Sequence, residues 1–204
     1  MRVIVVTGGI GSGKSEVCRI MSACGLELQY DADGRVKMLY ADHPTLLEDI
    51  ESELGCGLRD DAGSFVPAKL AAKIFDNPFA LKTVENLVFP ALIEDFKAFC
   101  DGNSGHENVI FESATILEKP QFDGFGDLII LVDAPIEERI HRACGRDGAD
   151  RDKVLARIRN QKLMNALSEG HTDPRIDVVI KNDGTLEDLR QKTKAVADAI
   201  MKRS

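Results

Sequence analysis

The sequence predicts an α/β protein with a doubly wound, five-stranded parallel sheet, and three observations support this. Apolar, β-branched runs alternate with stretches of helical character, and a glycine-rich segment joins the first run to the first helix. The runs are continuously apolar, which is typical of parallel strands covered on both faces. Right-handed crossovers would connect such strands. The expected strands are 2–7, 26–30, 108–111, 127–133 and 176–181.

Helices are expected between these strands. The segment 16–24 reads as a helix that ends near Gly25, and 186–201 reads as an amphipathic terminal helix. The long stretch between the second and third strands lacks a strand signal and is too long for one crossover. It reads as helices at 44–55, 68–75 and 78–100. We therefore expect a single domain over 1–204, with a helical region inserted at 42–104.

Composition excludes several classes of protein. The 204 residues are 44% hydrophobic and 29% charged, with a net charge of −8, so a general nucleic-acid binder is not expected. No apolar run is long enough to span a bilayer, and no secretory pattern is found, so no membrane partner is expected. The five cysteines are an odd number and widely spaced, which favours reduced thiols in the cytoplasm.

The segment from Gly8 to Ser15 matches the phosphate-binding pattern G-x-x-x-x-G-K-[ST]. Its glycines let successive backbone N–H groups surround an anion, and the following helix adds its positive N-terminal dipole. Lys14 would reach the β- and γ-phosphates, and the Ser15 hydroxyl would ligate Mg²⁺. A chance glycine turn is the alternative, but the strand before it and the helix after it favour the motif. The predicted nucleotide-binding residues here are Gly8, Gly9, Gly11, Ser12, Gly13, Lys14, Ser15 and Glu16.

The acceptor side is predicted from carboxylates at the strand ends. Asp31 and Asp33 follow the second strand, where ligands of open parallel sheets bind. Asp33 could accept the proton of an attacking hydroxyl, with Asp31 as support, or both could be N-caps of a helix beginning near Gly34. Glu112 could orient Mg²⁺ through water. Asp133 is the alternative metal carboxylate, although it could instead cap the next helix.

A basic segment is predicted to act as a lid over the nucleotide. Residues 135–162 hold eight basic and five acidic side chains, a local net charge of +3. Arg142 and Arg146 would share one helix face and could stack on adenine or clamp phosphate oxygens. Gly145 and Gly148 mark an expected break where the lid, placed at 142–162, could hinge. The eight basic residues are Arg139, Arg142, Arg146, Arg151, Lys153, Arg157, Arg159 and Lys162.

The ordered set of motifs resembles the dephospho-CoA kinase family over nearly the whole chain. The resemblance rests on TGGIGSGKS at 7–15, DAD at 31–33, IF-x-x-P at 74–78, ESATILE at 112–118, VDAP at 132–135, R-x-x-x-RD at 142–147, RI-x-x-Q at 157–161 and DVVIKNDG at 177–184. It implies a P-loop kinase fold and transfer of the ATP γ-phosphoryl group to the ribose 3′-hydroxyl of dephospho-CoA.

The resemblance also implies residue roles. Asp33, Lys14 and Arg142 would be catalytic; Arg142, Arg146 and Asn182 would complete the ATP site; and Asp33, Glu112 and Arg146 would contact the acceptor. The inserted helices would be the CoA-binding region. ATP, dephospho-CoA and Mg²⁺ would be the small-molecule partners of a monomer or small homo-oligomer. The family often has threonine where this chain has Glu16.

Two other functions stay open at this stage. One is a P-loop kinase of another small, nucleotide-like acceptor, because the acceptor pocket is the least readable part of the chain. The other is a non-catalytic nucleotide-binding regulator, which the intact Lys14–Ser15 pair and Asp33 disfavour. The guanine-reading N-K-x-D segment of GTPases is absent from the sequence, which favours ATP over GTP.

Overall fold

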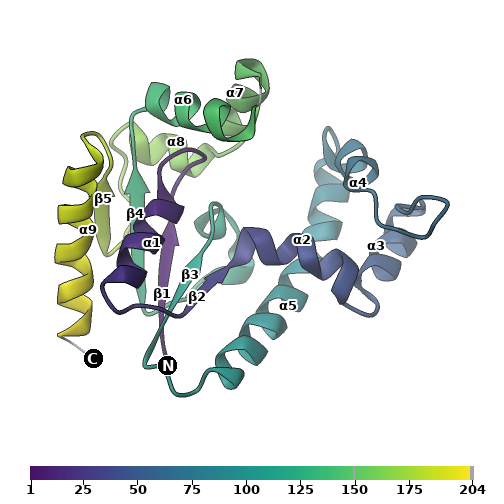
Figure 1. Ribbon diagram of the computed structural model, residues 1–204. Coiled ribbons are helices and arrows are strands. Elements are labelled where there is room, and N and C mark those ends of the chain that lie inside the picture. Colours follow the sequence, from purple (N-terminus) through teal and green to yellow (C-terminus); the bar gives the residue numbers. More distant parts are fainter. Residues whose placement is uncertain (149, 203–204) are drawn as a thin grey trace. The chain divides into compact units, whose positions relative to one another are not determined.

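The computed structural model describes residues 1–148 and 150–202, which form two compact units (Figure 1). The first unit, Met1–Asp31 with Ser104–Ser204, contains the sheet, and the second, Ala32–Asn103, is helical. Residue 149 of the predicted lid lies outside the described residues, as do the last two residues of the chain.

The sheet has five parallel strands in the order β2-β3-β1-β4-β5, flanked by helices, which confirms the predicted fold class. β1 is central, with Val6 beside Glu112 of β3 and beside Ile130 of β4. The strand predicted at 26–30 forms only at its end, because pairing with β3 begins at Gln29. The strands are β1 (Arg2–Thr7), β2 (Gln29–Asp31), β3 (Asn108–Glu112), β4 (Leu128–Asp133) and β5 (Val178–Lys181).

The two faces of the sheet bury different side chains because neighbouring residues of a strand point to opposite faces. Ile4 and Val6 of β1 belong to a core that includes α1 (Lys14–Ala23) and α9 (Leu186–Met201). Phe111 of β3 belongs to a second group, in which its ring contacts Tyr30, Phe122 and Phe125. Full burial of each such side chain contributes about 1.5–3 kcal/mol.

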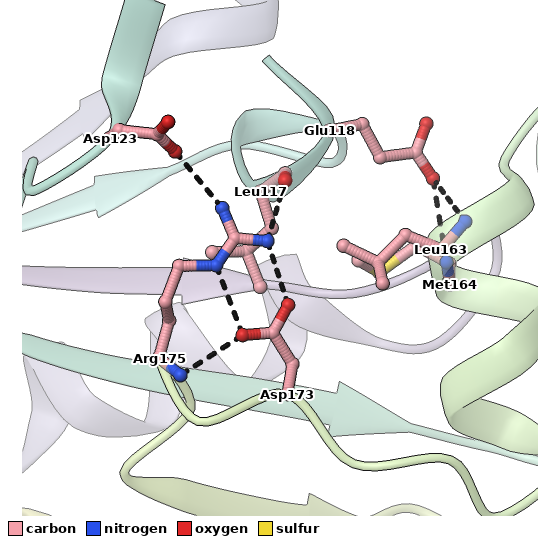
Figure 2. A network of polar contacts seen from close by, with 7 residues as sticks. All are labelled: Leu117, Glu118, Asp123, Leu163, Met164, Asp173 and Arg175. Atoms are coloured by element: carbon pink, nitrogen blue, oxygen red, sulfur yellow. Dashed lines mark hydrogen bonds and ion pairs between the residues drawn. The ribbon is translucent and has the colours of Figure 1, made fainter. Parts of the chain in front are cut away.

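Three helices follow β4 and carry the predicted lid: α6 (Ile136–Asp147), α7 (Arg151–Arg159) and α8 (Lys162–Ser168). The base of α8 is fixed to the short helix η1 (Ile116–Glu118). Figure 2 shows Glu118 Oε1 accepting hydrogen bonds from the backbone N–H groups of Leu163 (3.0 Å) and Met164 (3.4 Å). This carboxylate satisfies two donors that every helix start leaves free.

The chain that leads from α8 into β5 is tied to the same region by Arg175. Figure 2 shows its guanidinium between Asp173 (2.7 Å), Asp123 (3.2 Å) and the carbonyl oxygen of Leu117 (2.9 Å). The Arg175 hydrogen bond holds the pKa of Asp173 below its usual value. Both the start of α8 and the chain that follows it are therefore bonded to other segments of the first unit.

The second unit consists of α2 (Ala32–Asp42), α3 (Leu46–Leu54), α4 (Pro67–Ile74) and α5 (Pro78–Gly102), so helices form at the three predicted places. α5 packs against the other three helices. Asn77 caps α5 by accepting a hydrogen bond from Ala80 N (3.0 Å), and Pro78 takes the first helical position, which suits its fixed φ. Arg35 of α2 binds both carboxylate oxygens of Asp95 on α5, at 2.6 and 2.8 Å.

No helix among the described residues has the combination of length and hydropathy needed to cross a membrane.

Candidate active site

The glycine loop connects the end of β1 to the start of α1, as the motif predicts. Gly11 and Gly13 have φ values of 76° and 102°, a region that other residues rarely adopt. A Cβ on Gly11 would lie 2.1 Å from the carbonyl oxygen of Arg139, and a Cβ on Gly13 would lie 2.4 Å from Asn182 Nδ2. Both glycines are therefore required by close approach as well as by conformation.

Asn182 follows β5 and contacts the C-terminal part of the glycine loop. Its Nδ2 donates a 2.8 Å hydrogen bond to the carbonyl oxygen of Ser12, and its side chain is buried. Its backbone N–H donates to the carbonyl oxygen of Asp133 (2.7 Å), which fixes the turn after β5. The structure thus brings Asn182 directly against the loop, as one of the residues that shape it.

Arg142, on α6, lies next to Asn182. Its guanidinium donates to the carbonyl oxygen of Asn182 at 3.4 and 3.5 Å and lies 3.6 Å from the Glu138 carboxylate. Arg146 follows one turn later on the same helix and is exposed. The two arginines therefore share α6, as their spacing predicts.

The break expected at Gly145 and Gly148 is confirmed at Gly148 and wrong at Gly145. α6 continues through Gly145, and it ends at Gly148, whose φ of 58° is the left-handed conformation of a helix C-cap. Gly145 is tolerated inside the helix because a glycine there costs only about 1 kcal/mol relative to alanine.

Ser15 and Glu112 meet beside the loop. The Ser15 hydroxyl donates a 2.7 Å hydrogen bond to Glu112 Oε1, although 97 residues separate them. Glu112 ends β3, and Asp31 is its register partner on β2, so both carboxylates stand at the sheet edge that carries the loop. A hydroxyl and a carboxylate are the hard oxygen donors that Mg²⁺ prefers, so the pair fits this ion.

Asp133, the alternative metal carboxylate, is engaged elsewhere. Its Oδ1 accepts a 2.8 Å hydrogen bond from the Ser168 hydroxyl of α8. It does not cap α6 either, because Pro135 stands at the N-cap position. The geometry therefore favours Glu112 as the carboxylate beside Ser15.

Asp31 and Asp33 lie on either side of the start of α2. The helix begins at Ala32, two residues earlier than the sequence predicts, so Asp31 precedes it and Asp33 lies in its first turn. Both side chains are exposed. Asp33 therefore is not an N-cap, and it belongs to the helical unit, whereas Asp31 ends a strand of the sheet unit.

Glu16 has a local role that the sequence left unexplained. Its carboxylate binds Arg19 through two hydrogen bonds, at 2.5 and 2.8 Å, one turn along α1. The hydrogen bond from Arg19 lowers the pKa of Glu16. A negative side chain in the first turn also interacts favourably with the helix dipole.

Sequence reasoning missed two residues that contact the loop. The sequence places Arg139 only among the lid cations, yet its side chain is 1% exposed and packs against the loop backbone. Gln161, at the start of α8, accepts a hydrogen bond from Ile10 N (2.9 Å). A signal for Arg139 is present in the sequence: it lies next to Ile140 and one turn before Ala143, both of which are buried, so it faces the protein interior.

Cys18 is a third residue whose place only the structure reveals. It is 1% exposed on α1, and burial together with the neighbouring Glu112 carboxylate raises the pKa of its thiol. Because the thiolate is the reactive form, Cys18 should be chemically inert in the folded protein.

We predict that Cys18 resists alkylation of the native protein at pH 8, reacting at least about tenfold more slowly than the half-buried Cys24. Peptide mapping by mass spectrometry after timed iodoacetamide exposure measures this. All five cysteines should be labelled after denaturation, which serves as the control. Equal rates for Cys18 and Cys24 in the native protein would contradict the burial of Cys18.

An all-parallel sheet with a glycine-rich phosphate loop after its central strand is the architecture of the P-loop kinases. A shikimate kinase from Acinetobacter baumannii shares this fold with a TM-score of 0.54 and 15% identity, covering 100% of this chain and 95% of that chain. The family model described as dephospho-CoA kinase matches residues 2–188. The chain therefore belongs to the dephospho-CoA kinase family and is a kinase.

Two relatives within this family show how far the similarity extends. A dephospho-CoA kinase from Porphyromonas gingivalis is 34% identical over 175 residues, which cover 85% of this chain and 84% of that protein. A structure of a dephospho-CoA kinase from Campylobacter jejuni has a TM-score of 0.66 at 22% identity, covering 98% of this chain and 97% of that chain.

Proposed function

We propose that this protein transfers the γ-phosphoryl group of ATP to the ribose 3′-hydroxyl of dephospho-CoA, giving coenzyme A. The family match over 2–188 supports the reaction. The observation that carries the chemistry is the Ser15–Glu112 contact beside the glycine loop, where a metal–nucleotide complex would be held. The alternatives of another acceptor or a non-catalytic regulator have no comparable support.

The donor half of the site is built to bind a triphosphate. The start of α1 directs its backbone N–H groups and its positive dipole toward the loop, and Lys14 adds a full charge at the first residue of that helix. Arg142 on α6 carries a second cation, and it contacts Asn182, which is hydrogen-bonded to the loop. Phosphoryl transfer depends mainly on such positioning and charge stabilisation.

The Ser15 hydroxyl and Glu112 carboxylate would hold Mg²⁺, with Glu112 acting through a bound water. Magnesium retains several waters and takes few protein ligands, which agrees with one hydroxyl and one carboxylate. When bound, the ion would neutralise charge on the β- and γ-phosphate oxygens. The protein's own part is to orient the two oxygen ligands, and β3 does so by placing Glu112 one strand away from the loop.

The acceptor half of the proposal is assigned to the helical unit and to Asp33. The exposed carboxylate of Asp33 would accept the proton of the ribose hydroxyl as the new P–O bond forms. Asp33 lies in the first turn of α2, directly after the sheet strand that ends at Asp31. The helices of Ala32–Asn103 would bind the remainder of the CoA molecule. We further propose that the enzyme works in the cytoplasm, which agrees with its five free thiols.

A panel of acceptors tests the proposed reaction. Purified protein with ATP and Mg²⁺ is incubated with dephospho-CoA, and ADP release is followed together with the mass of the product. Coenzyme A itself is the matched control, because its 3′-hydroxyl is already phosphorylated and should give no turnover. Turnover of shikimate or adenosine without turnover of dephospho-CoA would overturn the proposal.

A further inference from the structure

Arg139 is a buried arginine that holds the back of the phosphate loop. Its side chain is 1% exposed. Nε donates to the carbonyl oxygen of Ile10 (3.1 Å), and Nη2 donates to Gln161 Oε1 (3.3 Å). Nη1 lies 3.4 Å from the Ser168 hydroxyl. All three partners are neutral oxygens.

Both backbone polar groups of Ile10, a residue of the glycine loop, are hydrogen-bonded to side chains. Its N–H donates to Gln161 Oε1 (2.9 Å) and its carbonyl accepts from Arg139. The Ile10 side chain packs against the small core formed by α6 and α7. A Cβ on Gly9 would lie 1.9 Å from Arg139 Nη2, so the guanidinium occupies the space directly behind the loop. These contacts set the orientation of the loop backbone.

The guanidinium of Arg139 is buried among neutral hydrogen-bond partners. Within the part of the chain that the structure describes, its guanidinium makes no ion pair, and the Ser168 hydroxyl stands between it and Asp133. Burial lowers the pKa of Arg139, and Asp133 partly opposes this. Arginine nevertheless stays cationic in proteins. A buried charge with only neutral partners is costly, and a bound anion would compensate it.

We propose that Arg139 is a positioning residue of the ATP site, which fixes the loop from Gly9 to Gly11 and supplies a positive charge that the bound triphosphate compensates. The inference rests on the proposed function only in taking ATP as the ligand. It makes no use of the acceptor.

The variant Gln161→Glu tests the effect of the Arg139 charge while the hydrogen bonds to the loop are kept. The glutamate keeps the shape of glutamine and can still accept from Ile10 N and from Arg139 Nη2, but it neutralises the guanidinium. Pairing the buried charge should raise the Tm of the nucleotide-free protein by about 2–4 °C. The Kd for a non-hydrolysable ATP analogue, measured by titration calorimetry, should rise at least about tenfold, since charged pairs couple by amounts of that order.

The matched control is Gln191→Glu, which makes the same charge change at an exposed position of α9. It should leave the Kd for the analogue within about twofold of the wild type, because an exposed charge is screened by solvent and salt. An unchanged Kd in Gln161→Glu would show that the triphosphate does not use the Arg139 charge, and would overturn the proposal.

Arg139→Met and Arg139→Lys separate positioning from folding. We expect Arg139→Met to change the Tm of the free protein by less than about 4 °C while raising the KM for ATP at least about tenfold. Arg139→Lys keeps the positive charge but lacks the several N–H donors of the planar guanidinium. Its KM for ATP should therefore lie between those of the wild type and Arg139→Met. A large drop in Tm with wild-type KM would assign Arg139 a purely structural role. If Arg139→Met does not fold, the Kd of Gln161→Glu for the ATP analogue alone tests the proposal.

The proposed function and this inference can fail separately. Binding of the ATP analogue is measured without dephospho-CoA, so a wild type that binds the analogue but does not phosphorylate dephospho-CoA would refute only the proposed acceptor. Loss of analogue binding in Gln161→Glu would still support the role of Arg139.

Discussion

Replacing Asp33 with asparagine is expected to lower kcat by about 10²–10⁴-fold, the usual contribution of a general base. The asparagine keeps the size of the side chain but cannot take the proton of the ribose hydroxyl. Folding should persist, because an exposed first-turn carboxylate contributes only about 0.3–1 kcal/mol through the helix dipole. Initial rates of ADP release with saturating dephospho-CoA measure the effect, and calorimetry should give an ATP affinity near that of the wild type.

Asp31→Asn is the matched control for this prediction. The same chemical change is made at an exposed aspartate two residues earlier, at the end of β2. We expect kcat to fall less than about tenfold in this variant. Near-wild-type turnover by Asp33→Asn would remove Asp33 from the role of base. Equal large losses in both variants would indicate that the pair acts jointly.

Replacing Lys14 with alanine is expected to lower kcat by about 10²–10³-fold, as does the loss of one preorganised donor at a site of developing charge. Lys14 is the first residue of α1, directly after the glycine loop, so its ammonium would neutralise the transferring phosphoryl group. ATP binding should weaken together with kcat, since Lys14 would also contact the phosphates of ATP before the transfer. Single-turnover measurements with saturating ATP separate the two effects.

Lys194→Ala provides the comparison for Lys14→Ala. It removes the same charge from an exposed position of α9, so kcat and the KM for ATP should stay within about twofold of the wild type. An undiminished kcat in Lys14→Ala would contradict the assignment of the loop as the donor site.

Local patterns were enough to predict much of this protein. The apolar run, the glycine cluster and the helix that follows specify the phosphate loop, because the φ values of Gly11 and Gly13 and the helix start are properties of neighbouring residues. The five strands and the three central helical segments could be read from continuous apolar runs and from breaks at Gly and Pro. The boundaries were less accurate at β2 and α2, where pairing with β3 and packing on α5 decide where each element starts.

The expectation of a helix break at Gly145, where α6 in fact continues, shows what local sequence patterns cannot predict. A glycine is permissive, and the residues around it decide whether a helix ends there. Ile140 and Ala143 pack into the core with α7, which keeps α6 helical beyond that point. Gly148 ends the helix because there the backbone adopts the left-handed conformation.

By itself, the sequence determined the fold class, the phosphate loop with Lys14 and Ser15, and the resemblance that led to the family. The tertiary structure alone decided how distant residues contact the phosphate loop and its helix: Glu112 lies beside Ser15, Arg139 behind Ile10, and Asn182 against Ser12. These pairs are 97, 129 and 170 residues apart. The physical reason is that strand order and register, which no local pattern encodes, bring the carboxyl ends of β3, β4 and β5 to the loop that follows β1.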